Sequence, residues 1–349
     1  MWLTVRFWFA LDVIAIDLAL SLPDGVLPLG VEHPESAAAR ALHDQWFLPV
    51  LRDLRREVVL ESVNRHDLFR LASFVSPRAP VEKVANTAIS LSAAIVVDDV
   101  FDSTEAAGND VGDFIEVMHG APVAGMSSEL VLWQQAMEHL RSRTSDGVFQ
   151  RLTGFFEQWL RSLESPPQAF DDVDSYLEYR RCNLGFDCLR GFVEYALDID
   201  MSLVPPSPDL EAFDAACGVH MSLVNDLFSY RKEAGDADVA NALNLLRRGR
   251  GISLQGAVDQ VCDRIRDAER DLAHHARTLS EGDDAHAQTM RLYTDTMKAN
   301  VGGHFAWTMS TPRFNGKGHA WDGTLPSACC CSPTERSCSQ PERTELTPP

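Results

Sequence analysis

Apolar residues recur every three or four positions along most of this chain. That spacing places them on one face of an α-helix and leaves polar residues on the other. Proline pairs and short proline- or glycine-rich segments separate one such stretch from the next. No stretch alternates convincingly between apolar and polar residues, and no segment repeats another. The pattern therefore predicts an all-α fold, a single-domain helical bundle.

The predicted helices differ in how evenly apolar residues cover them. The stretch at 81–102 is apolar nearly all round, which is typical of a central buried helix. Pro49 falls inside the first stretch, so a kink or break is expected there. The expected helices cover residues 35–60, 65–74, 81–102, 110–119, 126–141, 146–163, 173–196, 209–233, 240–246, 252–279 and 285–308.

Both ends of the chain depart from this pattern. Residues 1–30 start with an apolar, aromatic run and continue into a proline- and glycine-rich part, and we expect an irregular segment there. Asp12 and Asp17 interrupt the apolar run, which counts against a signal peptide or a membrane span. The helical domain is expected to occupy 31–315. Residues 316–349 lose periodicity and are predicted to be a disordered tail.

Composition narrows the class of partner. The chain has 349 residues, of which 45% are hydrophobic, so it has enough apolar side chains for a large core. Its formal net charge of -20 argues against nucleic acid, because duplex binding relies on Lys and Arg to neutralise phosphates. An anionic small molecule remains compatible with this charge, since divalent cations can bridge acidic side chains to it.

Eight cysteines are distributed unevenly. Four of them lie in predicted helices without any paired spacing, and we interpret these as buried, reduced side chains. The other four lie in the tail, where no paired metal-ligand set follows Cys329-Cys330-Cys331. This usage predicts a soluble protein in a reducing compartment, the cytoplasm.

A row of oxygen-bearing side chains interrupts the apolar pattern of the helix at 209–233. Asn225, Ser229 and Glu233 are four residues apart, so they fall within roughly an 80° arc of one helix face. Amide, hydroxyl and carboxylate oxygens are hard ligands, which suits Mg²⁺. The competing interpretation is a solvated face of an amphipathic helix. Apolar neighbours and the adjacent Asp226 count against it.

The buried helix at 81–102 ends in an acidic cluster. Asp98 and Asp102 share one helix face, and Asp99 lies about 100° away. Carboxylates at a helix C-terminus oppose the helix macrodipole, and a divalent metal would compensate for them. A solvated helix end in an acidic protein explains the cluster equally well from this motif alone.

The helix predicted at 173–196 contains two adjacent arginines and a glycine. Arg180 and Arg181 suit phosphate recognition, although surface arginines with buried stems are common. Gly185 costs a helix roughly 1 kcal/mol relative to alanine. Close approach of another group to that turn would account for the glycine.

In combination, these motifs resemble class I terpene synthases of the bacterial and fungal type. Asp98-Asp99-Val-Phe-Asp102 resembles their aspartate-rich motif, and Asn225-Asp226-Leu-Phe-Ser229-Tyr-Arg-Lys232-Glu233 resembles their NSE motif. The segment Tyr176–Gly185 resembles the one that carries a pyrophosphate-sensing arginine. Arg313-Phe314 stands where the family usually has Arg-Tyr. The resemblance covers residues 30–315.

The resemblance implies an α-helical barrel in which the two metal motifs face each other across the mouth of an apolar cavity. It implies three Mg²⁺ ions, with Mn²⁺ as a substitute, that bind the diphosphate of a linear isoprenyl diphosphate. Asp98 would bridge metals, and Asp99 and Asp102 would either join it or support it. The implied chelating set on the other side is Asn225, Ser229 and Glu233.

The resemblance also assigns residues to the diphosphate. Arg181, Lys232 and Arg313 would bind it, with Arg180 as the alternative to Arg181. Arg181 is preferred because Gly185 lies four residues on, at the family's effector position. Asn183 replaces a frequent threonine, and Phe314 replaces a tyrosine that donates a hydrogen bond, so this chain lacks that bond.

The implied reaction is ionisation of an allylic diphosphate, most simply farnesyl diphosphate, and cyclisation of the carbocation to a sesquiterpene with release of diphosphate. Charge on the leaving group calls for positioned cations, and the carbocation needs a dry cavity. Aromatic candidates for its wall are Phe74, Phe101, Tyr179, Phe186, Phe228 and Trp307.

Three alternatives remain open at this point: a diterpene synthase that uses geranylgeranyl diphosphate, a prenyl-chain-elongating transferase, and a non-catalytic helical interaction protein. An elongating transferase resembles this family but has a second aspartate-rich motif where this chain has the NSE pattern. The sequence also leaves the product skeleton and a homodimer open.

Overall fold

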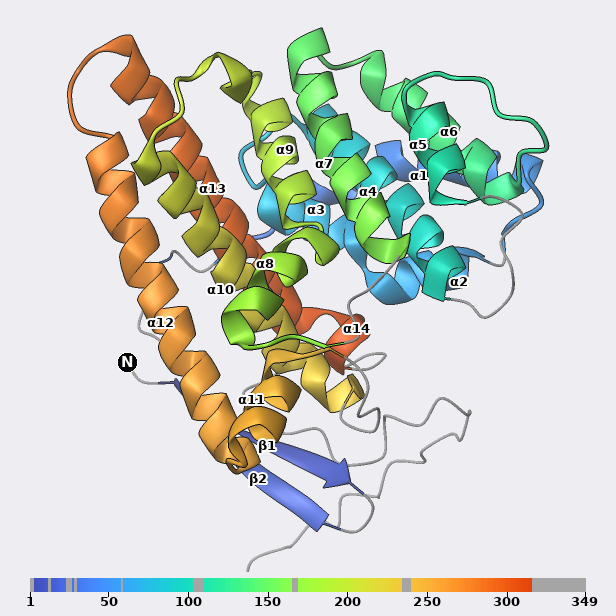
Figure 1. Cartoon of the computed structure of the whole chain (residues 1–349). Helices are drawn as coiled ribbons and strands as arrows, with labels where there is room; N and C mark the ends of the chain where they lie inside the picture. The colour runs from blue at the N-terminus through green and yellow to red at the C-terminus, as the bar shows by residue number, and fades with distance from the viewer. Residues whose placement is uncertain are drawn as a thin grey trace, which may run out of the picture.

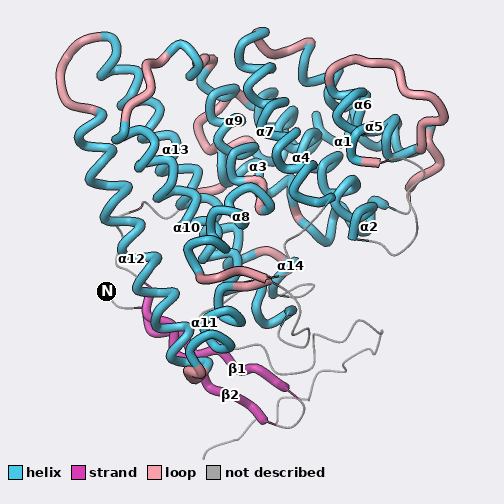
Figure 2. Tube along the Cα trace, in the orientation of Figure 1, coloured by secondary structure: helices cyan, strands magenta, loops and turns pink. Residues whose placement is uncertain are grey.

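The structure is a computed structural model that describes residues 3–11, 14–22, 27, 30–57, 59–102, 110–164, 169–233 and 240–315. Helices account for most of this part of the chain (Figures 1 and 2). The elements are β1 (Leu3–Leu11), β2 (Ile14–Leu22), α1 (Ser36–Asp53), α2 (Val59–His66), α3 (Leu68–Val75), α4 (Val81–Asp102), α5 (Val111–Met118), α6 (Ser128–Arg141), α7 (Asp146–Glu164), α8 (Val173–Asn183), α9 (Phe186–Leu197), the 3-10 helix η1 (Met201–Leu203), α10 (Pro208–Glu233), α11 (Ala242–Arg250), α12 (Leu254–Leu279), α13 (Ala285–Ser310) and α14 (Pro312–Asn315). The prediction of an all-α domain is confirmed.

The hairpin of β1 and β2 corrects the prediction for residues 1–30. The two strands are antiparallel, with Leu3 opposite Leu22 and Leu11 opposite Ile14, and β2 runs beside α12 (Figure 1). The expectation of an irregular segment was wrong for these residues. The sequence of β2 does alternate, because large apolar residues occupy every second position. Asp17 therefore fits the period of a strand and does not interrupt an apolar run.

Helix α4 is the centre of the bundle, as its evenly apolar sequence predicts. Helices α1, α3 and α6 pack around it, and residues 91–97 are all buried. Among the described helices α4 alone is long and apolar enough to cross a membrane, and the stretch Val81–Phe101 contains the qualifying window. Since 78% of that window is buried inside the protein, its composition reflects a core helix.

Two predicted helices are divided in the structure. The stretch 35–60 forms α1, which includes Pro49, and then breaks before α2 begins at Val59. The stretch 173–196 forms α8 and α9, separated at Gly185, whose φ of 76° is left-handed. Glycine adopts this conformation without a steric penalty, so the helix break explains the glycine.

Helix α10 lies between α12 and α13, and α13 also packs on α3 (Figure 1). The contact between α13 and α3 is close, because a Cβ added to Gly303 would collide with the backbone carbonyl of Phe74. The four cysteines in the described helices are free, as predicted, and three of them are buried. The tail at 316–349, with its four cysteines, lies outside the described residues.

Candidate active site

A cavity of about 550 Å³ lies among α3, α4, α7, α8, α9, α10, α13 and α14. Much of its wall is apolar, formed by residues such as Leu71, Leu91, Ile95, Phe156, Leu189 and Trp307. Its polar lining comes mainly from the C-terminal parts of α4, α8 and α10 and from α14. Asp98 lines this cavity together with Asn225 and Glu233. The two oxygen-rich motifs, which are far apart in the sequence, therefore meet at one cavity.

The NSE row lies on α10 in a well-packed setting. Asn225 is 7% exposed and accepts a hydrogen bond at Oδ1 from Arg180, at 2.8 Å. Glu233 accepts one from Asn241 Nδ2 at 3.1 Å. Burial raises the pKa of Glu233, and Arg180 opposes that shift. Ser229 is 1% exposed and lies between them on the same helix face. Asn225 and Ser229 are thus buried, and Asn225 and half-buried Glu233 line the cavity, which contradicts the interpretation of this row as a solvated face.

Asp226 supports this row, a role that the sequence did not show us. It is 1% exposed and accepts hydrogen bonds at Oδ2 from the Tyr176 hydroxyl (2.5 Å) and the backbone N–H of Ala242 (2.9 Å). At Oδ1 it accepts one from Arg180 Nε, at 3.0 Å. One buried carboxylate thus joins α8, α10 and the start of α11. Its adjacency to Asn225 was visible in the sequence, but its partners come from distant segments.

The two adjacent arginines face different ways. Arg180 lines the cavity, and besides Asn225 and Asp226 it donates to Asn183 Oδ1, at 3.0 Å. The Arg181 guanidinium instead pairs with Asp187, at 2.8 Å and 3.0 Å. Arg181 is absent from the described lining of the cavity. The preference for Arg181 over Arg180 at the diphosphate therefore lacks support from this geometry.

The acidic cluster of α4 also divides between two directions. Asp98 lines the cavity, whereas Asp99 accepts a hydrogen bond from the Ser62 hydroxyl and lies 3.6 Å from His66 Nε2. Asp99 therefore faces α2, as its helical angle from Asp98 predicts. Asp102 ends α4, and its side chain lies outside the described part of the structure, as does the side chain of Lys232 on α10.

Helix α14 adds a cation and an aromatic ring to the cavity. Arg313 is hydrogen-bonded to His66 Nδ1 and lines the cavity. Burial, together with Arg65, lowers the pKa of Arg313 to about 10, so it remains charged at neutral pH. Phe314 is 5% exposed and makes an edge contact with Trp307, at 5.8 Å between ring centroids.

Gly185 lines the cavity at the break between α8 and α9. Its positive φ, rather than crowding, requires glycine there, because the nearest atom to an added Cβ would be 3.8 Å away. Of the six aromatic residues predicted for the wall, Trp307 lines the described cavity, and the prediction missed Phe156 and Trp159. Helical spacing cannot distinguish a cavity wall from ordinary core.

The donors at the cavity fit a divalent cation. In the described ranges, no group of three or more His, Cys, Asp and Glu is arranged for a metal. The candidate donors are instead oxygen atoms of mixed type, namely the Asp98 and Glu233 carboxylates and the Asn225 amide. The amide oxygen that accepts from Arg180 retains a second lone pair. Hard oxygen donors of this kind suit Mg²⁺ or Mn²⁺ more than Zn²⁺.

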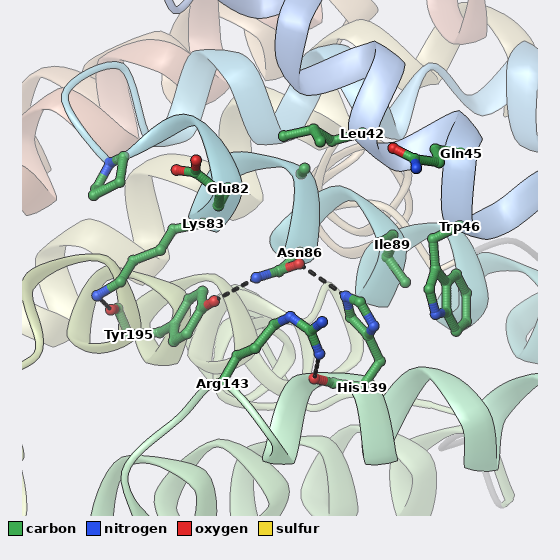
Figure 3. Close-up of a pocket in the computed structure, with 12 residues that line it drawn as sticks. Leu42, Gln45, Trp46, Glu82, Lys83, Asn86, Ile89, His139, Arg143 and Tyr195 are labelled. Carbon is green, nitrogen blue, oxygen red and sulfur yellow. Dashed lines mark hydrogen bonds between the residues drawn. The ribbon is translucent and has the colours of Figure 1, made fainter.

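A second cavity, of about 720 Å³, lies at the other end of α4 (Figure 3). Asn86 lies near its centre, donating to the Tyr195 hydroxyl (2.8 Å) and accepting from the His139 ring (2.9 Å). Lys83 binds the backbone carbonyl of Tyr195 at 2.7 Å and the Asp198 carboxylate at 2.6 Å. Trp46 and Ile89 form an apolar side.

Comparison with known proteins assigns the chain to a family. Residues 90–271 match the model of terpene synthase family 2, C-terminal metal binding. The matched segment contains the acidic cluster of α4, the two arginines of α8 and the NSE row of α10.

Individual relatives are similar over most of the chain. A (+)-germacrene D synthase from Selaginella moellendorffii is 23% identical over 81% of this chain and 86% of its own length. Sesquiterpene synthase 6 from Postia placenta is 22% identical over 82% of this chain and 86% of its own length. A solved structure titled "Hedycaryol apo" superposes with a TM-score of 0.68 at 22% identity, covering 82% of this chain and 99% of that one. This last likeness shows a shared fold.

Proposed function

This chain belongs to terpene synthase family 2, and from that premise we propose that it is a Mg²⁺-dependent cyclase that converts farnesyl diphosphate to a sesquiterpene. The family makes the chain a terpene synthase, a lyase. The proposal adds the substrate, the metal and the outcome. The observation that supports it most is that Asp98, Asn225 and Glu233 line one apolar cavity.

We assign the metal ligands to the two motifs that meet at the cavity. Asp98 would hold metal from α4, with Asp102 beside it, and Asn225, Ser229 and Glu233 would hold metal from α10. Three bound Mg²⁺ ions, or Mn²⁺, would supply positive charge to the leaving diphosphate. Asp99 supports Asp98 from the adjoining face, since its carboxylate is directed at Ser62 and His66.

Cationic side chains of this chain would bind and orient the diphosphate. Arg180 and Arg313 line the cavity and are the first candidates. Arg181 would have to leave Asp187 to reach a ligand there, and its role stays a prediction, as does that of Lys232. Preorganised cations of this kind stabilise charge that develops on a leaving group without reorganising in the reaction.

The remaining wall would guide and protect the carbocation. Apolar side chains keep water away from a species that water would quench. Trp307, which is 2% exposed, presents an aromatic ring in the same cavity, and such rings stabilise desolvated cations by up to about 2 kcal/mol. A volume of about 550 Å³ falls in the range of small-molecule sites. The Postia placenta relative is a sesquiterpene synthase by name, which favours a fifteen-carbon substrate for this chain.

The test is to incubate the full chain with farnesyl diphosphate and Mg²⁺ and to follow diphosphate release and extractable products. We expect a cyclic sesquiterpene and no activity after chelation of the metal. Parallel incubations with geranylgeranyl diphosphate, and with farnesyl diphosphate plus isopentenyl diphosphate, distinguish a diterpene synthase and an elongating transferase. Absence of diphosphate release from every substrate would favour a non-catalytic helical protein. The free cysteines of the described helices fit a cytoplasmic location.

A further inference from the structure

His304 is a cavity residue outside the motifs that the sequence brought forward. It lies on α13, three residues before Trp307, and it lines the candidate cavity while being only 2% exposed. Its Nδ1 is buried and has no hydrogen-bond partner, and no hydrogen bond of its Nε2 occurs within the described residues. Buried polar groups without partners are rare in folded proteins, and functional sites are among their explanations.

The imidazole of His304 is neutral. Burial lowers its pKa to about 3, and electrostatic interactions with His220 and Arg180 act in the same direction. A neutral imidazole has a lone pair on one ring nitrogen and can accept a proton. A carbocation nearby would also be tolerated, since the ring carries no charge that repels it.

Asn300 lies one turn earlier on the same face of α13. It is 0% exposed, and neither its Oδ1 nor its Nδ2 has a partner. Residues four apart on a helix are neighbours, with about 5–6 Å between their Cβ atoms. Two unpartnered polar side chains thus lie one turn apart on α13, and His304 lines the cavity. A small side-chain rotation could join the Asn300 oxygen to Nδ1–H of His304.

The other lone-pair groups on the cavity wall are less suited to receive a proton in the reaction. Asp98, Asn225 and Glu233 belong to the metal motifs. Cys188 also lines the cavity, but burial raises the pKa of its thiol, so it stays protonated. Among the described lining residues, His304 is the neutral nitrogen base.

We propose that His304 accepts the proton that ends the reaction and that Asn300 positions its ring. In this step the C–H bond next to the cationic carbon breaks, and its electron pair becomes the second bond of a C=C. The proton moves to Nε2, while Asn300 Oδ1 accepts from Nδ1–H and so fixes the lone pair on the cavity side. The imidazolium later returns the proton to the departing diphosphate or to solvent. This inference rests on the proposed function.

The experiment compares the products of the wild-type chain with those of His304→Leu and Asn300→Leu. Farnesyl diphosphate and Mg²⁺ are the probes, products are separated by gas chromatography with mass spectrometry, and diphosphate release is measured in parallel. Since ionisation precedes deprotonation, we expect release within about threefold of wild type in both variants. The share of the main product should fall at least about fivefold in His304→Leu and less in Asn300→Leu. Asn300→Asp keeps an acceptor oxygen and should restore the share of the main product.

His139→Leu is the matched control, because His139 lines the second cavity instead. It should leave the product distribution unchanged. An unchanged distribution in a folded His304→Leu that still releases diphosphate would overturn the inference and leave the proposed function intact. If circular dichroism shows that His304→Leu does not fold, Asn300→Leu replaces it in the test. An unchanged product distribution in a folded Asn300→Leu that still releases diphosphate would then overturn the inference. A wild-type chain that releases no diphosphate would instead overturn the proposed function.

Discussion

The two cavities that α4 lines differ in how their polar groups are used. In the second cavity, the central polar side chains are hydrogen-bonded to one another, with Asn86 joined to both Tyr195 and His139 (Figure 3). In the candidate active site, the lining residue His304 has an unpartnered ring nitrogen, and acidic and cationic groups converge. The second cavity is nevertheless the larger one, at about 720 Å³ against about 550 Å³.

Volume therefore does not identify the reactive site. A polar group that already has its hydrogen bonds gains little from a ligand, because binding must first break them. Polar groups that are buried without partners lower the stability of the free protein. A ligand or reacting atom that bonds to them compensates for this cost. The difference between the cavities lies in this unused bonding capacity, and each experiment below tests it.

The largest expected effect comes from removing a proposed metal ligand. Asn225→Ala or Glu233→Gln should lower the rate of diphosphate release by about 100-fold or more, because stabilisation of the leaving group would be lost. Gln45→Ala, in the second cavity, is the control and should change the rate less than about twofold. A comparable loss of diphosphate release in Gln45→Ala would show that the two cavities do not differ in their part in the reaction.

A second test distorts one cavity and not the other. In Gly303→Ala the added methyl group would collide with the Phe74 carbonyl, pushing α13 away from α3. We expect a loss of about 1–3 kcal/mol in unfolding free energy, together with altered products. Gly154→Ala, in the interior of α7, meets no atom within 4 Å and should instead stabilise the protein by about 1 kcal/mol. Urea denaturation measures the unfolding free energy of both variants. Equal unfolding free energies for Gly303→Ala and Gly154→Ala would contradict the close packing of α13 on α3.

The two histidines give a comparison in pH. Burial lowers the pKa of His304 to about 3 and, with Arg143, that of His139 to about 4. Since both folded values lie below the usual 6.5, the neutral ring favours the folded state above that pH, and this stability is lost as pH falls from 6.5 toward these values. At about pH 5 the loss due to His304 should be on the order of 2 kcal/mol.

The measurement is urea denaturation of wild type, His304→Gln and His139→Gln at about pH 7.5 and about pH 5. His304→Gln should remove the share due to His304, about 2 kcal/mol at about pH 5. His139→Gln should remove a comparable amount, because a pH of about 5 lies above the folded pKa of both histidines. Identical pH dependence in wild type and His304→Gln would show that the ring is not kept neutral by burial.

The smallest expected effect lies in the second cavity. Tyr195→Phe removes the oxygen that accepts from Asn86 and should cost about 1 kcal/mol of stability. Diphosphate release should stay within about twofold of wild type, since the network there holds the fold together. A much larger loss of activity, with folding intact, would give the second cavity a part in the reaction.

The helical domain and the meeting of the acidic cluster of α4 with the NSE row of α10 were predictable because they depend on local periodicity and on motif order. Asn225, Ser229 and Glu233 lie on one face through helix geometry alone. The partners of Asp226 were not predictable, since they come from α8 and α11. The directions of the Arg180 and Arg181 side chains were also not predictable from the sequence. The preference for Arg181 relied on its spacing of four from Gly185, and that spacing takes no account of the helix break at Gly185.

Gly30 shows that the segment before α1 contacts the helix that carries His304. Its backbone N–H donates to the carbonyl of Gly302, at 3.2 Å, two residues before His304 on α13. A side chain at Gly30 would strike Gly303, so the chain crosses α13 at backbone contact distance. The segment leading into α1 is therefore a strap that crosses the helix that carries the proposed base. A shortened protein that starts at Ser36 would keep every motif residue and yet lose the strap that fixes that helix from behind.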